Sequence, residues 1–309
     1  MYNLSDYRNS KGYIIIDELK DTELKLYDIL GRKTKYKFNY NNKNYIFKEI
    51  NQASFEDLSH VLYQELIEFW GLKSAEYDFA IYGGKRGVLT PNFLAQNEKL
   101  ITGQSILNII NTTNRENSIN EILTNNIADL TKAIKILNSE HNTKDIIGSI
   151  LQELVTDGVL LETDRNTTNW GYIVDYKKSK PSPFYDGSNI FGLNKSIVDI
   201  ETKVKNIRDV STMISYMNSL KRSLHFSKNT ENLTFFEELN LIYDKSPAII
   251  EELANKIIET DMESIFENLE KRTNFKIPYC ADLLIRKLFD ESKNILCETT
   301  QYSKCKEKY

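Results

Sequence analysis

The first hundred residues alternate between apolar and polar positions, a pattern that predicts several strands. Residues 36–48 read as a β-hairpin, because two alternating runs flank the polar turn at 41–44. A second hairpin is predicted over 77–90, and a short apolar run at 13–16 predicts one more strand. This part of the chain is therefore expected to form a sheet.

One helix interrupts these strands. The apolar residues recur every three or four positions, at Phe55, Leu58, Leu62, Leu66 and Phe69. Ser54 is a good N-cap residue and Gly71 a good terminator, so the pattern predicts an amphipathic helix over 54–70.

Beyond residue 101 the apolar spacing becomes helical, apart from a loop-rich interval at 162–194. Helical patterns cover residues 119–137, 146–161, 203–225, 232–244, 247–272 and 280–296. The sequence thus predicts an α+β fold of two lobes. A small β-rich N-lobe with one helix would span 1–98, and a larger α-helical C-lobe would span 99–309.

Composition argues against nucleic-acid-binding, disulfide-rich, secreted and membrane proteins. The formal net charge of −4 gives no reason to expect direct nucleic-acid binding. Cys280, Cys297 and Cys305 form neither a CxxC pair nor a plausible disulfide framework, which favours a reducing cytoplasm. The first residues lack the features of a signal peptide, and no apolar run is long enough to span a bilayer. We expect a cytoplasmic protein with no membrane association.

Four polar residues stand in an order that suits phosphoryl transfer. Lys48 ends an apolar strand, Asp164 and Asn169 lie in the loop 163–171, and Asp186 precedes a glycine in the segment 184–189. Transfer of phosphate needs a carboxylate near the nucleophilic hydroxyl, oxygen ligands for magnesium and a lysine for the nucleotide phosphates. The order of lysine, Asp-x4-Asn and then Asp-Gly is that of a kinase.

These residues resemble the HipA-like serine/threonine kinases, especially their compact, CtkA-like single-chain members. Residues 154–172 are similar to that family's catalytic loop with its preceding helix, and 184–186 to its metal-binding segment. Residues 45–48 resemble the strand of the nucleotide-binding lysine, and 71–77 and 87–94 also follow the family pattern. The resemblance implies a protein-kinase-like fold with ATP and Mg²⁺ in a cleft.

The resemblance also implies roles for the four residues. Asp164 would orient the substrate hydroxyl and accept its proton, and Lys48 would contact the α- and β-phosphates of ATP. Asn169 and Asp186 would ligate Mg²⁺. The resemblance implies a Ser or Thr hydroxyl as the substrate, most simply on another protein, and a partner similar to the antitoxins of this family.

Further nucleotide contacts follow from the same resemblance. Asn92, Phe93 and Leu94 would form the hinge that binds adenine. Gly31 and Lys35 bound the segment where the phosphate-covering loop belongs, and Thr34 within it is a candidate for autophosphorylation.

One position departs from the family pattern. The family carries a glutamate on the small-lobe helix, eleven residues before its end, where this chain has His60. Glu56 lies one turn earlier on the same face, so either Glu56 or His60 is a possible partner of Lys48.

Other interpretations remain open at this point. The chain could be a pseudokinase-like module that binds nucleotide or a partner without transferring phosphate, or a kinase of a small molecule or lipid headgroup. Each residue also has a simpler explanation: Asp164 as a turn cap with Arg165 a solvated neighbour, Asn169 and Asp186 as turn residues, and Lys48 as a surface lysine.

Overall fold

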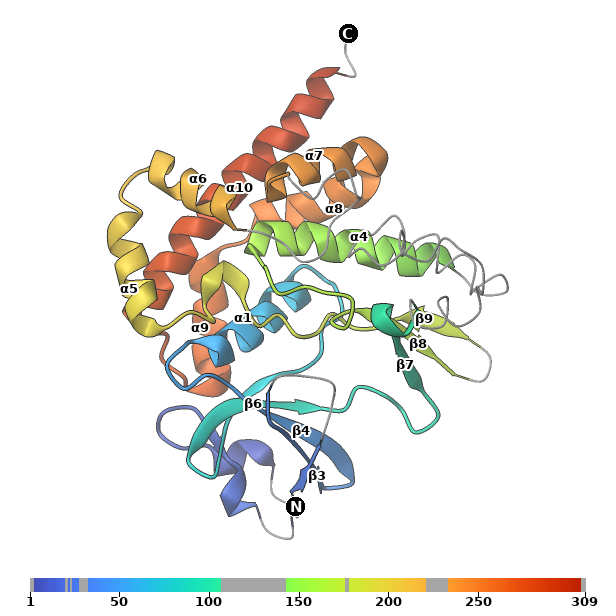
Figure 1. Cartoon of the computed structure of the whole chain (residues 1–309), viewed down its shortest axis with the longest axis vertical. Helices are drawn as coiled ribbons and strands as arrows, with labels where there is room; N and C mark the ends of the chain where they lie inside the picture. Colours follow the sequence, from blue (N-terminus) through green and yellow to red (C-terminus); the bar gives the residue numbers. More distant parts are fainter. Residues whose placement is uncertain are drawn as a thin grey trace, which may run out of the picture. The chain divides into compact units, whose positions relative to one another are not determined.

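The computed structural model describes residues 3–19, 22, 24–27, 33–106, 143–175, 178–220 and 233–306. The chain folds into two compact units that interleave along the sequence (Figure 1). Unit 1 comprises Met1–Phe93, Gly187–Asn206 and Asp261–Arg286, and unit 2 comprises Leu94–Asp186, Ile207–Thr260 and Lys287–Tyr309. Unit 1 therefore includes two stretches that the sequence analysis assigned to a C-terminal lobe.

Unit 1 is built on a six-stranded sheet in the order β1-β5-β6-β4-β3-β2. Its strands are β1 (Ile14–Ile15), β2 (Lys25–Leu26), β3 (Lys35–Tyr40), β4 (Lys43–Glu49), β5 (Asp78–Tyr82) and β6 (Lys85–Pro91). The β1–β5 pair is parallel and the other pairs are antiparallel.

Both predicted hairpins are present. The β3–β4 turn is formed by Asn41 and Asn42, with φ of 51° and 61°, and the β5–β6 turn by Gly83 and Gly84, with φ of 56° and 74°. Two successive positive φ angles match the twist of the strands they join, and Asn and Gly tolerate them best.

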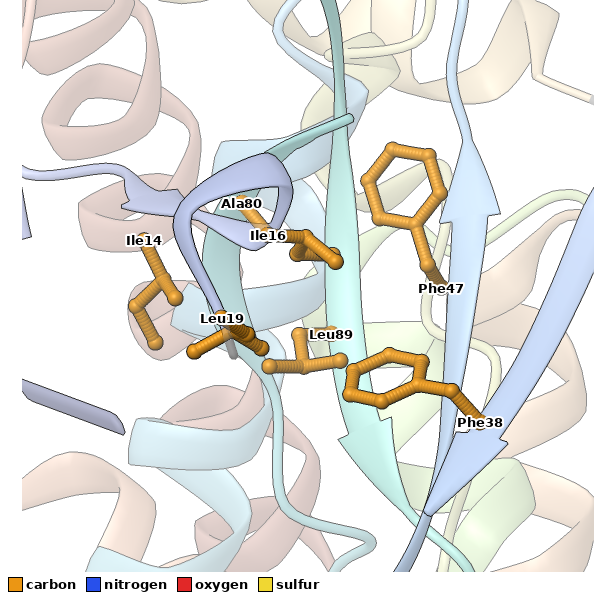
Figure 2. Packing of buried hydrophobic residues seen from close by; sticks show 7 residues of the cluster. All are labelled: Ile14, Ile16, Leu19, Phe38, Phe47, Ala80 and Leu89. Carbon is orange, nitrogen blue, oxygen red and sulfur yellow. The ribbon is translucent and has the colours of Figure 1, made fainter. Parts of the chain in front are cut away.

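A hydrophobic cluster fills one face of this sheet. Figure 2 shows Phe38 and Phe47 on neighbouring strands, facing Leu89 and the segment that carries Ile16 and Leu19. Phe47 is 1% exposed, so the alternation of a strand turns the next residue, Lys48, toward the opposite face.

The opposite side of the sheet is covered by α1 (Glu56–Phe69), which packs on β5 and β6. The helix ends as predicted at Gly71, whose φ is +76° while the Leu72 N–H donates to the Ile67 carbonyl at 3.0 Å. Its start differs from the prediction. The N-cap is Phe55, and the Ser54 hydroxyl accepts the Glu56 N–H only at 3.4 Å.

Unit 1 also contains η4 (Ile190–Gly192), α5 (Ile197–Asn206), α9 (Met262–Thr273) and the first part of α10 (Tyr279–Lys306), besides the short 3₁₀ turns η1 (Leu4–Tyr7) and η2 (Ile16–Glu18). Helix α9 packs against α1, and the residues after α9 bring Phe275 onto Phe79, with ring centroids 4.1 Å apart.

Unit 2 combines a small antiparallel sheet with helices. Its strands are β7 (Lys99–Thr102), β8 (Gly171–Val174) and β9 (Ser179–Pro181), in the order β7-β8-β9. Its helices are α4 (Thr143–Leu160), α6 (Val210–Ser219), α7 (Phe235–Lys245), α8 (Pro247–Ile258) and the latter part of α10 (Tyr279–Lys306). Helix α4 packs against α7 and α8, and all three lie together in Figure 1.

Two of the predicted helices are divided. The pattern at 247–272 forms α8 and α9, because Asp261 caps a new helix by accepting the N–H groups of Glu263 and Ser264. The pattern at 203–225 spans parts of α5 and α6, and the predicted helix 119–137 lies outside the described residues. Among the described helices, none combines the length and apolar character needed to cross a membrane.

Candidate functional site

Lys48 on β4 faces away from the hydrophobic cluster and contacts helix α1. Its Nζ lies 3.1 Å from Nε2 of His60 and 3.9 Å from Oε1 of Glu56. The Lys48 side chain is 12% exposed, and those of Glu56 and His60 are buried. The interpretation of Lys48 as a surface lysine is therefore wrong.

The carboxylate of Glu56 lies beside two lysine ammonium groups. Its Oε2 forms an ion pair with the ammonium group of Lys33, a residue just before β3, while Oε1 faces Lys48 and His60. A carboxylate this buried needs cationic or hydrogen-bonding partners to offset its desolvation. Two lysines beside one buried carboxylate leave a net positive charge, which suits a phosphate group.

The predicted hinge lies where the chain passes from unit 1 to unit 2, since the boundary falls between Phe93 and Leu94. The Asn92 N–H donates to the Asn44 carbonyl at 2.8 Å and so extends the pairing of β4 with β6. Of the predicted phosphate loop, Lys35 begins β3, and Gly31 lies outside the described residues.

In unit 2 the loop between α4 and β8 brings Asp164 and Asn169 together. The Asn169 side chain is buried, and its Nδ2 donates to the Asp164 carbonyl at 3.0 Å. The Asp164 N–H in turn donates to Oε1 of the buried Glu162 at 2.6 Å. The Asp164 residue itself is exposed. The Asn169 Oδ1 atom accepts a hydrogen bond from the Thr168 hydroxyl at 3.1 Å.

Arg165 is buried, so its interpretation as a solvated neighbour is wrong. Its side chain is 2% exposed and donates from Nε and Nη2 to the two carboxylate oxygens of Asp157 on α4, at 3.0 and 3.1 Å. Its Nη1 donates to the carbonyls of Asn169, at 3.0 Å, and Tyr185, at 2.5 Å. One guanidinium group thus joins the helix, the loop and the segment before Asp186.

A second carboxyl group lies beside the same guanidinium. Glu153 Oε1 on α4 is 3.2 Å from Arg165 Nη1. Burial raises the pKa of Glu153 to about 8, because desolvation outweighs the attraction of Arg165 and nearby Asp157 adds to the rise. The fork of Arg165 is already engaged with Asp157, so Glu153 is held as a neutral acid near pH 7.

Asp186 adopts a left-handed backbone conformation, with φ of +61°. Such a conformation is uncommon outside glycine and is often found at functional sites. The preceding residues hold it on the unit 2 side, where Phe184 is buried and the Tyr185 hydroxyl donates to the Thr168 carbonyl at 2.9 Å.

The residue after Asp186 belongs to unit 1 and is fixed on α1. The Gly187 carbonyl accepts the Ser59 hydroxyl at 2.9 Å, and the same hydroxyl accepts the Ile190 N–H at 3.0 Å. A Cβ atom on Gly187 would lie 2.2 Å from Cγ of Tyr63, so only glycine fits there.

The structure therefore brings the predicted residues into two sets. Unit 1 joins Lys48 with Glu56 and His60, and unit 2 joins Asp164 with Asn169 and, through Arg165, with the backbone next to Asp186. Within the described part of the chain, no three His, Cys, Asp or Glu side chains gather as a metal site. One carboxylate and one carboxamide are nonetheless donors that suit Mg²⁺, with water and phosphate oxygens as its other ligands.

Sequence reasoning placed Lys33 in the predicted phosphate loop but missed its pairing with Glu56, and it missed the role of Arg165. The signal for Arg165 is Asp157, a lone acidic residue within the apolar run 154–161 that requires a buried cation nearby. No comparable signal marks Lys33, because its contact with Glu56 joins residues from separate elements.

No protein-family description matches this chain, and no curated protein matches its sequence. Among solved structures it is similar to CtkA, described as a proinflammatory kinase of Helicobacter pylori, with a TM-score of 0.71 and 18% identity over 91% of this chain and 96% of that one. It is also similar to HipA of Shewanella oneidensis MR-1, solved in a toxin–antitoxin complex with HipB and its operator DNA. That match has a TM-score of 0.52 and 12% identity over 89% of this chain and 67% of HipA.

These similarities establish the fold. The chain has an α+β protein-kinase-like fold, with a six-stranded sheet in unit 1 and a mainly helical unit 2. The predicted fold class is confirmed, and the resemblance to HipA-like kinases is confirmed at the level of the fold.

Proposed function

We propose that this protein is an ATP- and Mg²⁺-dependent kinase that transfers phosphate to a Ser or Thr hydroxyl of a protein. The observation that carries the proposal is the hydrogen bond from Asn169 Nδ2 to the Asp164 carbonyl, in a chain with a kinase-like fold. It holds the proposed base and a proposed metal ligand in one rigid loop.

The proposed reaction is an in-line displacement at the γ-phosphorus of ATP. The hydroxyl oxygen of the substrate forms a bond to this phosphorus, the bond to the β–γ bridging oxygen breaks, and ADP leaves. The exposed Asp164 carboxylate accepts the hydroxyl proton. Bound Mg²⁺ would neutralise charge on the phosphates, held by Asp186 and Oδ1 of Asn169.

Lys48 would hold the α- and β-phosphates in this reaction. The contacts with Glu56 and His60 support that role, because they fix the ammonium group of a long, flexible side chain. Lys33, paired with the same carboxylate, adds positive charge close by.

Incubation with γ-labelled ATP and Mg²⁺ tests the proposal. The purified protein should label itself or a protein substrate in an extract, and Asp164→Ala should abolish labelling while leaving nucleotide binding and the melting temperature nearly unchanged. Asp175→Ala, which removes an aspartate after β8 in the same unit, is the matched control and should label normally. Equal labelling by wild type and Asp164→Ala would contradict the proposal.

One observation favours a second candidate, a pseudokinase-like nucleotide-binding module. Lys48 makes its closer contact with a histidine rather than with a carboxylate. If ATP raises the melting temperature but no label is transferred to protein under any metal condition, this second function replaces the first.

A further inference from the structure

Asn169 and Asp186 are the proposed metal ligands, and a single nitrogen atom of Arg165 binds a backbone carbonyl next to each of them. Nη1 of Arg165 donates to the carbonyl of Asn169 itself and to the carbonyl of Tyr185, which precedes Asp186. These two carbonyls come from separate segments of unit 2, the loop before β8 and the segment after β9.

The other side of the guanidinium is held by α4. Nε and Nη2 form the two parallel hydrogen bonds with Asp157 that fix the plane of an arginine side chain. Asp157 is 1% exposed and Arg165 2%, so the ion pair is shielded from water. A planar group held in this way fixes the position of Nη1 between the two carbonyls, whereas a lysine ammonium could not also form the two parallel hydrogen bonds with Asp157.

We propose that Arg165 is a positioning residue that sets the spacing of Asn169 and Asp186, so that the two side chains bind one divalent cation. This inference rests on the proposed function, since it takes these two residues as the metal ligands. Groups that orient metal ligands typically change metal affinity by about 10- to 100-fold when they are replaced.

The test measures binding of AMP-PNP, a non-hydrolysable ATP analogue, by calorimetry across a series of Mg²⁺ concentrations and in EDTA. For Arg165→Lys we expect the half-saturating Mg²⁺ concentration to rise about tenfold or more, with affinity for AMP-PNP in EDTA unchanged. Lys180→Met is the matched control. It removes a cation of the same unit that pairs with Glu98 on the surface, and it should behave as wild type.

If Arg165 acted only through stability, any variant that lowers the melting temperature equally would raise the Mg²⁺ requirement equally. Val159→Ala, at a buried position of the same helix as Asp157, should lower the melting temperature of the apo protein but leave the half-saturating Mg²⁺ concentration near the wild-type value. If the Mg²⁺ requirement instead follows the melting temperature in both variants, Arg165 acts only through stability and the inference is wrong.

Measurements on Asp186→Asn and on the wild-type protein distinguish failure of this inference from failure of the proposed function. Asp186→Asn should lose the Mg²⁺ dependence altogether, and if it does while Arg165→Lys matches wild type, the inference fails and the proposed function stands. Wild-type protein that binds AMP-PNP without any Mg²⁺ dependence would contradict the proposed function itself.

If Arg165→Lys does not fold, the double variant Arg165→Gln/Asp157→Asn replaces it. This variant leaves no buried charge unpaired, and the same rise in the half-saturating Mg²⁺ concentration is expected.

Discussion

Lys48 Nζ lies 3.1 Å from His60 Nε2 and 3.9 Å from Oε1 of Glu56, one turn earlier on the same helix. A neutral imidazole accepts a hydrogen bond from an ammonium group but supplies no negative charge. Glu56 supplies that charge, and it does so for Lys33 as well. The carboxylate beside the proposed nucleotide-binding lysine is therefore that of Glu56, one helical turn before His60.

The shared carboxylate gives the first prediction. Glu56→Gln should slow phosphate transfer about tenfold more than His60→Gln, equivalent to about 1.4 kcal/mol in the barrier, because glutamine at position 60 still offers a hydrogen-bond acceptor. Rates with γ-labelled ATP measure the difference. Equal effects of the two substitutions would remove Glu56 as the partner of Lys48.

Lys48 itself should be required for turnover and not for folding. Lys48→Ala is expected to lower the rate of phosphate transfer by about 100-fold or more, the usual effect of removing one group that stabilises developing charge. The melting temperature should change little. Lys43→Ala, on the same strand with an exposed side chain, should retain the wild-type rate. A collapse in melting temperature for Lys48→Ala would make the lysine structural.

Glu153 predicts how stability depends on pH. Burial raises its pKa from an ordinary value of 4.5 to about 8, so the folded state keeps a proton that the unfolded state releases. This favourable contribution is complete below pH 4.5 and is lost as the pH rises to 8. Relative to Glu153→Gln, the wild type should therefore lose free energy of unfolding over this range, by at most about 1.4 kcal/mol for each pH unit.

Denaturant unfolding at several pH values measures this loss. Glu252→Gln, at a mostly exposed position on α8, is the control and should follow the wild-type profile. Parallel profiles for wild type and Glu153→Gln would mean that Glu153 is ionised in the folded protein.

Gly187 gives a prediction about packing. Gly187→Ala places a methyl group 2.2 Å from Cγ of Tyr63 and should destabilise the protein by about 1–3 kcal/mol. Gly148→Ala is the opposite case, since nothing lies within 4 Å of its added Cβ in helix α4. It should stabilise the protein by about 0.5–1 kcal/mol. Equal midpoints for the two variants in urea would contradict the contact with Tyr63.

Local sequence patterns were sufficient to predict the larger helices and strands of the fold. The hairpins at Asn41 and Gly83 and the end of α1 at Gly71 follow from backbone preferences that each residue carries by itself. The strands β2, β7 and β9 were not predicted, since segments of two to four residues hold too few positions to show alternation. The division near residue 260 was also missed, because Asp261 interrupts an otherwise continuous helical pattern.

The candidate site was predictable only in part. Lys48, Asp164, Asn169 and Asp186 are marked by their order along the chain, and the inward orientation of Lys48 by the apolar residues of its strand. The contacts that hold these residues are long-range and leave no local pattern. Lys33 with Glu56, and Arg165 with the Tyr185 carbonyl, are known only once the chain has folded.

The interleaving of the two units constrains how the protein can mature on the ribosome. The ring of Phe275 stacks on Phe79 at 4.1 Å and meets Tyr13 at 5.7 Å, so the first sheet acquires part of its packing from residues synthesised almost two hundred positions later. A nascent chain that has emerged only to residue 98 would expose these rings. The amino-terminal sheet therefore completes its packing only after residue 275 has been synthesised.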